Sequence, residues 1–210
     1  MSNKIKAFAF FLTISFIFIT NTACTQDKNN DTKVAASSNG KSEGTENKDI
    51  ALNNSDLGQV FSIESVGSPV QGKATNFTWS HNGQTMNFAD LTKNKVVFLN
   101  FWGTWCPPCR KEIPDIIEIG KELNGKDFII VGISMERDQQ NAKATVEQFI
   151  QKNGINYMNF IANPEIINSY GGITGVPTTF IIDKNGNISD KVVGMRDKAT
   201  FMDLINKVLK

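Results

Sequence analysis

The stretch VVFLNFWGTWCPPC, residues 96–109, decides the fold because an apolar run passes directly into a pair of cysteines. Residues 96–102 are almost continuously apolar, which is typical of a central strand buried on both faces. Cys106 and Cys109 follow, separated by two prolines. Proline is well tolerated in the first turn of a helix, so a helix should begin here. The stretch therefore predicts a buried strand that leads into a helix with two cysteines at its start.

The spacing of these cysteines indicates redox chemistry. Cysteines three positions apart at a helix start share a face and are close enough to form a disulfide. Cys106 should lie over amides that have no helical partner and at the positive end of the helix dipole, which favours its thiolate. Cys109, one turn later, should be shielded and should resolve a mixed disulfide formed by Cys106.

Two other interpretations of the cysteine pair are weaker. A purely structural disulfide would close so short a loop that little chain entropy is removed. A structural zinc site needs four Cys or His ligands, and only His81 and Cys24 remain to complete one.

The two intervening prolines refine the redox prediction. Pro107 and Pro108 have no N–H to donate to the Cys106 sulfur, which leaves the amide of Cys109 as the main donor. The thiolate should therefore be less stabilised than in motifs where both intervening residues donate. Because stabilising the reduced form makes a strong oxidant, this arrangement favours a reductant.

Strands and helices alternate around the motif, which predicts an α/β sandwich with a mixed central sheet flanked by helices. An Asn82-Gly83 pair after His81 indicates a hairpin turn, and residues 183–186 indicate another. Strands are expected over 59–66, 77–79, 85–88, 96–102, 128–134, 157–161, 178–182 and 188–193, and helices from about 113 to 123, 142 to 150, 164 to 170 and 201 to 209.

The N-terminal quarter of the chain is expected to consist of a targeting signal followed by a tether. Residues 1–23 combine two early lysines, a short apolar run and small residues, which is typical of a signal peptide. Cys24 follows where a bacterial lipoprotein carries its lipidated cysteine, although Asn21 departs from that pattern; an ordinary cleaved signal is the alternative. Residues 24–56 are polar, with no aromatic side chain, and predict a flexible tether before a domain over 57–210.

Composition narrows the classes of function. The chain has 22 Lys and Arg against 21 Asp and Glu, so its net charge of +1 predicts no general attraction to nucleic acid. His81 is the one histidine, which excludes metal cages built from several histidines. No metal and no cofactor beyond a redox-active disulfide between Cys106 and Cys109 is expected.

From about Ala74 to Lys210 the sequence resembles the TlpA/ResA-type thiol-disulfide oxidoreductases of the thioredoxin superfamily. The resemblance rests on residues 76–78, the hairpin to Leu91, 96–110, 111–114, the run GVPTTF at 175–180 and the turn at 183–186. It implies a thioredoxin-like fold with an N-terminal β-hairpin extension. It also implies that Cys106 is the attacking thiol, that Cys109 resolves, and that Pro177 is a cis-proline beside them.

The same resemblance assigns further site residues. Val176, before the cis-proline, should offer backbone hydrogen bonds to a partner's extended chain, and Trp105 and Pro107 should form the rim that contacts partners. Asn100 stands where thioredoxins carry a buried acid. Glu112 matches the acid that the ResA-type branch places near its active site, where burial would raise its pKa and let it relay the Cys109 proton. The alternative for Glu112 is a first-turn residue that only complements the helix dipole.

These features predict an extracytoplasmic enzyme of the bacterial cell envelope, anchored by lipid at Cys24 or secreted if unmodified. It would reduce disulfides in exported proteins, with apocytochrome c as one candidate, and draw electrons from a membrane dithiol donor. A peroxiredoxin-like peroxidase and a copper-binding assembly factor of the same fold are alternatives. The peroxidase is the weaker interpretation because its P-x-x-x-[ST]-x-x-C pattern does not lead up to Cys106. The copper-binding factor is weaker because such proteins use a C-x-x-x-C motif and a distant histidine, whereas two residues separate the cysteines here.

Overall fold

The computed structural model describes residues 57–210. The expected signal peptide, the expected lipidation site at Cys24 and the expected tether lie outside the described residues. Within the described part, none of the helices has the length and apolar character needed to cross a membrane.

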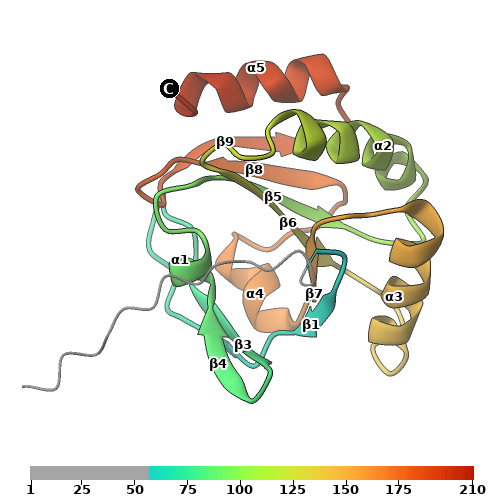
Figure 1. The fold of residues 1–210 in the computed structure, drawn as a ribbon. Helices are drawn as coiled ribbons and strands as arrows, with labels where there is room; N and C mark the ends of the chain where they lie inside the picture. The colour runs from blue at the N-terminus through green and yellow to red at the C-terminus, as the bar shows by residue number, and fades with distance from the viewer. Residues whose placement is uncertain (1–56) are drawn as a thin grey trace, which may run out of the picture. The chain divides into compact units, whose positions relative to one another are not determined.

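A six-stranded mixed sheet forms the centre of the fold, in the order β1-β7-β6-β5-β8-β9 (Figure 1). The first four strands in this order run parallel, and β8 is antiparallel to both of its neighbours. Every residue of β5 is buried, as expected for a central strand with covered faces. The strands are β1 (Val60–Ser62), β5 (Val96–Trp102), β6 (Phe128–Ser134), β7 (Met158–Ile161), β8 (Thr178–Ile182) and β9 (Ile188–Val193).

Different layers cover the two faces of this sheet. Residues of α2 (Pro107–Glu122), α3 (Ala142–Asn153) and α5 (Lys198–Val208) share one hydrophobic cluster with one face. A second cluster joins the other face to α1 (Phe88–Leu91), α4 (Pro164–Ser169) and a small antiparallel sheet. That small sheet consists of β2 (Ser65–Val66), β3 (Phe77–His81) and β4 (Gln84–Asn87). In Figure 1, α2 and α5 lie above the sheet, and α4 and the β3-β4 hairpin lie below it.

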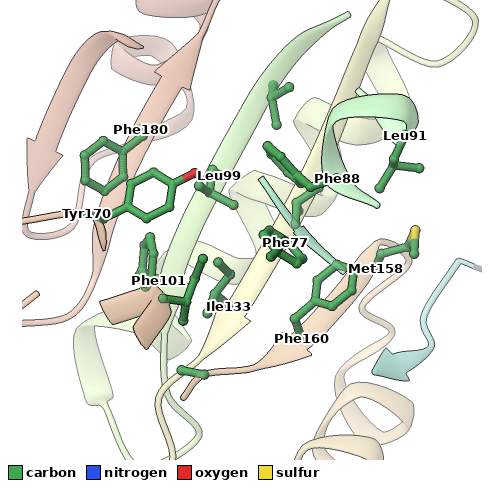
Figure 2. Close-up of a cluster of buried hydrophobic side chains, with 14 of the residues drawn as sticks. Phe77, Phe88, Leu91, Leu99, Phe101, Ile133, Met158, Phe160, Tyr170 and Phe180 are labelled. Atoms are coloured by element: carbon green, nitrogen blue, oxygen red, sulfur yellow. The ribbon is translucent and has the colours of Figure 1, made fainter. Parts of the chain in front are cut away.

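The second cluster is rich in aromatic rings, several of which are drawn in Figure 2. The Phe160 ring on β7 lies 4.9 Å from both Phe77 and Trp79 on the hairpin, measured between ring centroids. Phe77 also stacks on Phe88 at 4.9 Å. Edge-to-face and offset pairs of this kind contribute beyond their buried area, so they hold the hairpin sheet on the central sheet.

The expected thioredoxin-like sandwich with its hairpin extension is confirmed, with two local corrections. The strand expected over 59–66 is divided, because β1 pairs with β7 in the main sheet and β2 pairs with β3 in the small one. Phe88, expected at a strand end, begins α1, because the Asn87 side chain accepts a hydrogen bond from the Asp90 amide at 2.9 Å and caps that helix. The hairpin turn is as expected, with positive φ at Asn82 and Gly83.

Candidate active site

The cysteine pair lies at the edge of the main sheet where β5 ends. Because β6 runs parallel to β5, its carboxyl end lies at the same edge. β8 runs the other way and therefore begins there, and β9 again ends there. Four segments consequently meet around the cysteines: the turn after β5, the loop after β6, the segment before β8 and the loop after β9.

Cys106 is the N-cap residue of α2, and Cys109 lies in the first turn of that helix. The two sulfurs are joined in a disulfide, with their Cα atoms 5.3 Å apart. The Cys109 amide donates to the Cys106 sulfur at 3.2 Å, as the missing N–H groups of Pro107 and Pro108 predicted. Cys106 is 2% exposed and Cys109 is fully buried, so what little sulfur surface is open to a partner belongs to Cys106.

A cis peptide bond joins Val176 and Pro177 beside the disulfide, as the resemblance implied. The Val176 carbonyl oxygen lies 3.5 Å from the Cys106 sulfur. The Pro177 carbonyl accepts a hydrogen bond from the Gly194 amide at 2.8 Å, which attaches the loop after β9 to this segment. Pro177 is buried, whereas Val176 is half-buried and borders the surface.

Glu112 lies on the inner side of α2, one turn after Cys109, and only 1% of it is exposed. Its Oε1 accepts a hydrogen bond from the Asn100 side-chain amide at 3.0 Å, while Oε2 has no hydrogen-bond partner within residues 57–210. Burial raises the pKa of Glu112 from 4.5 to about 7, against the lowering effect of Asn100 and Arg196. The expected burial and upward pKa shift are both present.

Thr179 completes this buried polar group and was not predicted from the sequence. Asn100 donates to Thr179 Oγ1 at 3.0 Å as well as to Glu112. The two residues are directly paired in the β5–β8 ladder, which brings them together. Three polar side chains thus form one hydrogen-bonded group under the start of α2.

Trp102 and Trp105 differ in exposure and in hydrogen-bond partner. Trp102 is fully buried and donates from Nε1 to Asn159 Oδ1 at 3.0 Å. Trp105 is 39% exposed, yet its Nε1 donates to the Met135 carbonyl at 2.8 Å, which fixes its orientation. A side chain at Gly103 would come within 2.7 Å of that nitrogen, so only glycine leaves room for the ring there. Pro107 is exposed beside it on the first turn of α2.

Glu136 anchors the turn that precedes Cys106, and sequence reasoning missed this residue. Its carboxylate accepts hydrogen bonds from the Thr104 amide at 2.9 Å and the Thr104 hydroxyl at 2.8 Å. The Ser134 hydroxyl also donates to it at 2.8 Å. The signal available in the sequence was an acid two positions after a strand end, which does not by itself show what the carboxylate binds.

The histidine lies apart from this group of residues. His81 ends β3 on the small sheet, where its ring contacts Phe61 edge-on at 5.4 Å. No cluster of three or more His, Cys, Asp or Glu side chains suited to holding a metal ion occurs in the described range.

The chain is similar to known thiol-disulfide oxidoreductases over the part that carries this site. The family model described as AhpC/TSA family matches residues 70–191. The thiol-disulfide oxidoreductase ResA of Bacillus thuringiensis (strain Al Hakam) is 31% identical over 154 residues, which cover 72% of this chain and 86% of the relative.

Two solved structures share the fold at comparable identity. A thioredoxin-family thiol:disulfide interchange protein from Chlorobium tepidum TLS is 33% identical, with a TM-score of 0.54, covering 72% of this chain and 97% of that one. A secreted thiol-disulfide isomerase from Corynebacterium glutamicum is 28% identical, with a TM-score of 0.51, covering 61% and 78% of the two chains.

Proposed function

The chain belongs to the AhpC/TSA family and is a ResA-type member of the thioredoxin superfamily, and from this premise we propose that it reduces disulfides of exported proteins at Cys106 and Cys109. The observation that carries the proposal is the arrangement of the two sulfurs. They are bonded to each other at the start of α2, beside the cis Val176–Pro177 bond. A disulfide that closes so small a loop adds little stability, so a chemical role explains it better.

The reaction transfers two electrons from the cysteine pair to the client. The Cys106 thiolate attacks one sulfur of the client disulfide, forming a mixed disulfide and releasing the other client sulfur as a thiolate, which takes up a proton. Cys109 then loses its proton and attacks Cys106. This second exchange releases the client as a dithiol and leaves the Cys106–Cys109 disulfide, the state in the structure. A dithiol donor must reduce the protein again before the next cycle.

Glu112 would accept the Cys109 proton in the second step. Its raised pKa of about 7 lies near the working pH, where a carboxyl can both take up and give away a proton. Asn100 holds one carboxyl oxygen and leaves Oε2 without a hydrogen bond in residues 57–210. Asn100 therefore holds the Glu112 carboxyl in position, and Oε2 stays available to accept the Cys109 proton.

The client would bind across the rim of the site. An extended client segment would form backbone hydrogen bonds with Val176, beside Pro177, and bring its disulfide to Cys106. Trp105 and Pro107 border this position on the other side and present apolar surface to the segment.

We place this reaction outside the cytoplasm, with the domain anchored to the cell envelope by lipid at Cys24. The signal-like residues 1–23 support this placement, as does the likeness to a secreted isomerase. A membrane dithiol protein would supply the electrons. Cytochrome c maturation, in which cysteines must be kept reduced for haem attachment, is one role that such a reductase would serve.

Insulin reduction by the purified protein tests the proposal. We expect Cys106→Ser to lose the activity and Cys109→Ser to accumulate a mixed disulfide with insulin, because it lacks the resolving thiol. Cys24→Ser is the matched control and should reduce insulin at the rate of the unchanged protein. Retained activity in Cys106→Ser would contradict the proposal, and rapid peroxide consumption or tight copper binding would favour the two alternatives.

A further inference from the structure

The chain contains only three arginines, Arg110, Arg137 and Arg196, and its other basic residues are lysines. The three arginines come from separate parts of the sequence. Arg110 follows Cys109 on α2, Arg137 lies in the loop after β6, and Arg196 lies in the loop after β9. Because β5, β6 and β9 all end at the same edge of the main sheet, the fold gathers every arginine of the chain around the disulfide.

Arg137 lies over the Trp105 ring. Its guanidinium carbon is 4.1 Å from the centre of the ring, a cation–π contact. The Trp105 ring is itself fixed by its hydrogen bond to the Met135 carbonyl. The guanidinium is therefore held at a defined place on the rim, over the residue that precedes Cys106 in the sequence.

Arg196 is fixed on the opposite side of the disulfide. Its Nη1 donates to the carbonyls of Gly194 and Met195, at 3.3 and 2.8 Å. The Gly194 amide in turn donates to the Pro177 carbonyl, which attaches this loop to the cis-proline beside Cys106. Arg196 is exposed, and Arg110 is exposed on the first turn of α2.

None of these arginines forms an ion pair with a carboxylate in the described part of the chain, whereas Lys143, Lys184 and Lys198 do. The acids that adjoin the arginines in the sequence are occupied with other groups. Glu136 binds Thr104 and Ser134, Asp138 accepts from the Gln140 amide and the Asn141 side chain, and Asp197 caps α5 through the Thr200 amide. Arg196 lowers the pKa of the buried Glu112 from a distance, but none of the three guanidinium groups is neutralised by a paired carboxylate in residues 57–210, so they can still bind an acidic partner.

We infer that this arginine rim, made up of Arg110, Arg137 and Arg196, binds acidic side chains that flank the disulfide of a client protein. The guanidinium group is planar and matches a carboxylate with two parallel hydrogen bonds, which lysine cannot do. The inference rests on the proposed function and adds to it the charge of the client. A lipid surface is the less suitable partner, because one seated on this rim would cover Cys106 and exclude the client.

The test uses three synthetic peptides, each with one internal Cys-x-x-Cys disulfide flanked by glutamates, glutamines or lysines. At low salt, the reduced protein should show a kcat/KM roughly tenfold higher for the acidic peptide than for the neutral one, because rim charges act mainly on association. At about 0.5 M salt the preference should largely disappear.

Two triple variants identify the source of the preference. In Arg110→Gln/Arg137→Gln/Arg196→Gln, the kcat/KM values for the acidic and neutral peptides should lie within about twofold of each other. The matched control, Lys93→Gln/Lys126→Gln/Lys152→Gln, removes as much charge from exposed positions before β5, before β6 and at the end of α3. It should keep the preference.

Several outcomes would overturn the inference while leaving the proposed function intact. One is equal reduction of all three peptides by the unchanged protein. Another is an equal loss for all three in the arginine variant, together with a changed Cys106 pKa, which would show that the arginines act on the thiolate. A third is arginine-dependent sedimentation with phosphatidylglycerol vesicles and no peptide preference, which would indicate a membrane partner. Failure to reduce any peptide or insulin would instead overturn the proposed function itself.

Discussion

Glu112 lies one turn after Cys109 on the inner side of α2, where its carboxyl is removed from water and held by the Asn100 amide. Burial raises its pKa from 4.5 to about 7. Between these two pH values the folded protein keeps a proton that the unfolded chain has lost. The free energy of unfolding contributed by this group therefore falls as the pH rises through that window and is constant above it.

The substitution Glu112→Gln should remove this pH dependence. Relative to the unchanged protein, the variant should gain about 2–3 kcal/mol in free energy of unfolding between about pH 5 and about pH 8, because it has no carboxyl to ionise in the buried site. Urea denaturation of the disulfide form measures the difference, since its bonded cysteines do not titrate. Glu165→Gln, at an exposed position of α4, controls for the loss of one charge. A gain of the same size in that control would refute the burial argument.

Helix α2 sets the environment of the Cys106 sulfur through its first turn. Cys106 is the N-cap, and the amide that reaches its sulfur belongs to Cys109, the third residue of the helix. Pro107 and Pro108 occupy the two positions between them and have no N–H. An N-cap side chain accepts from the second or third helical amide, so the proline at position 108 removes one of the two donors available to Cys106.

Restoring that donor should strengthen the thiolate. In Pro108→Ala, the pKa of the Cys106 thiol should fall by about one pH unit, and the reduction potential should become less negative, because the reduced form is stabilised. The ultraviolet absorbance of the thiolate, followed against pH, measures the first effect. Pro107→Ala is the matched control, since the amide that it adds lies at the first helical position and does not point to the cap. Equal shifts in both variants would show that proline acts through something other than the lost donor.

Local pattern was enough to predict the elements that form the site. The apolar run of β5 and β6 and the prolines at the start of α2 each specify their own structure, and these elements were placed correctly. The strand expected over 59–66 was wrong because its two halves pair with different partners, which local pattern does not encode. For the same reason Thr179 and Glu136 were missed: their contacts with Asn100 and Thr104 depend on strand register and loop packing.

The whole described domain is built on one sheet with a hydrophobic layer on each face. The layer that includes α2 and α5 supports the site, for example through the contact of Phe98 with Phe201 at 4.9 Å between ring centroids. The other layer joins the sheet to the small hairpin sheet around Phe160 (Figure 2). Strands β5, β6 and β7 carry side chains into both layers, so the two layers share one backbone framework and should unfold together.

Substitution in the layer far from the cysteines tests this cooperativity. Phe160→Ala removes a fully buried ring that contacts Phe61, Phe77 and Trp79, and it should lower the free energy of unfolding by about 3–5 kcal/mol. Two urea midpoints are measured on the reduced protein: one by circular dichroism, and one from alkylation of the buried Cys109 thiol, which is detected by the mass of the peptide that contains it. If the domain unfolds as one unit, both midpoints should fall together. Phe201→Ala, in the layer next to α2, should shift both midpoints in the same way. A variant at Phe160 whose circular dichroism midpoint falls while Cys109 stays protected would show that the hairpin layer unfolds independently.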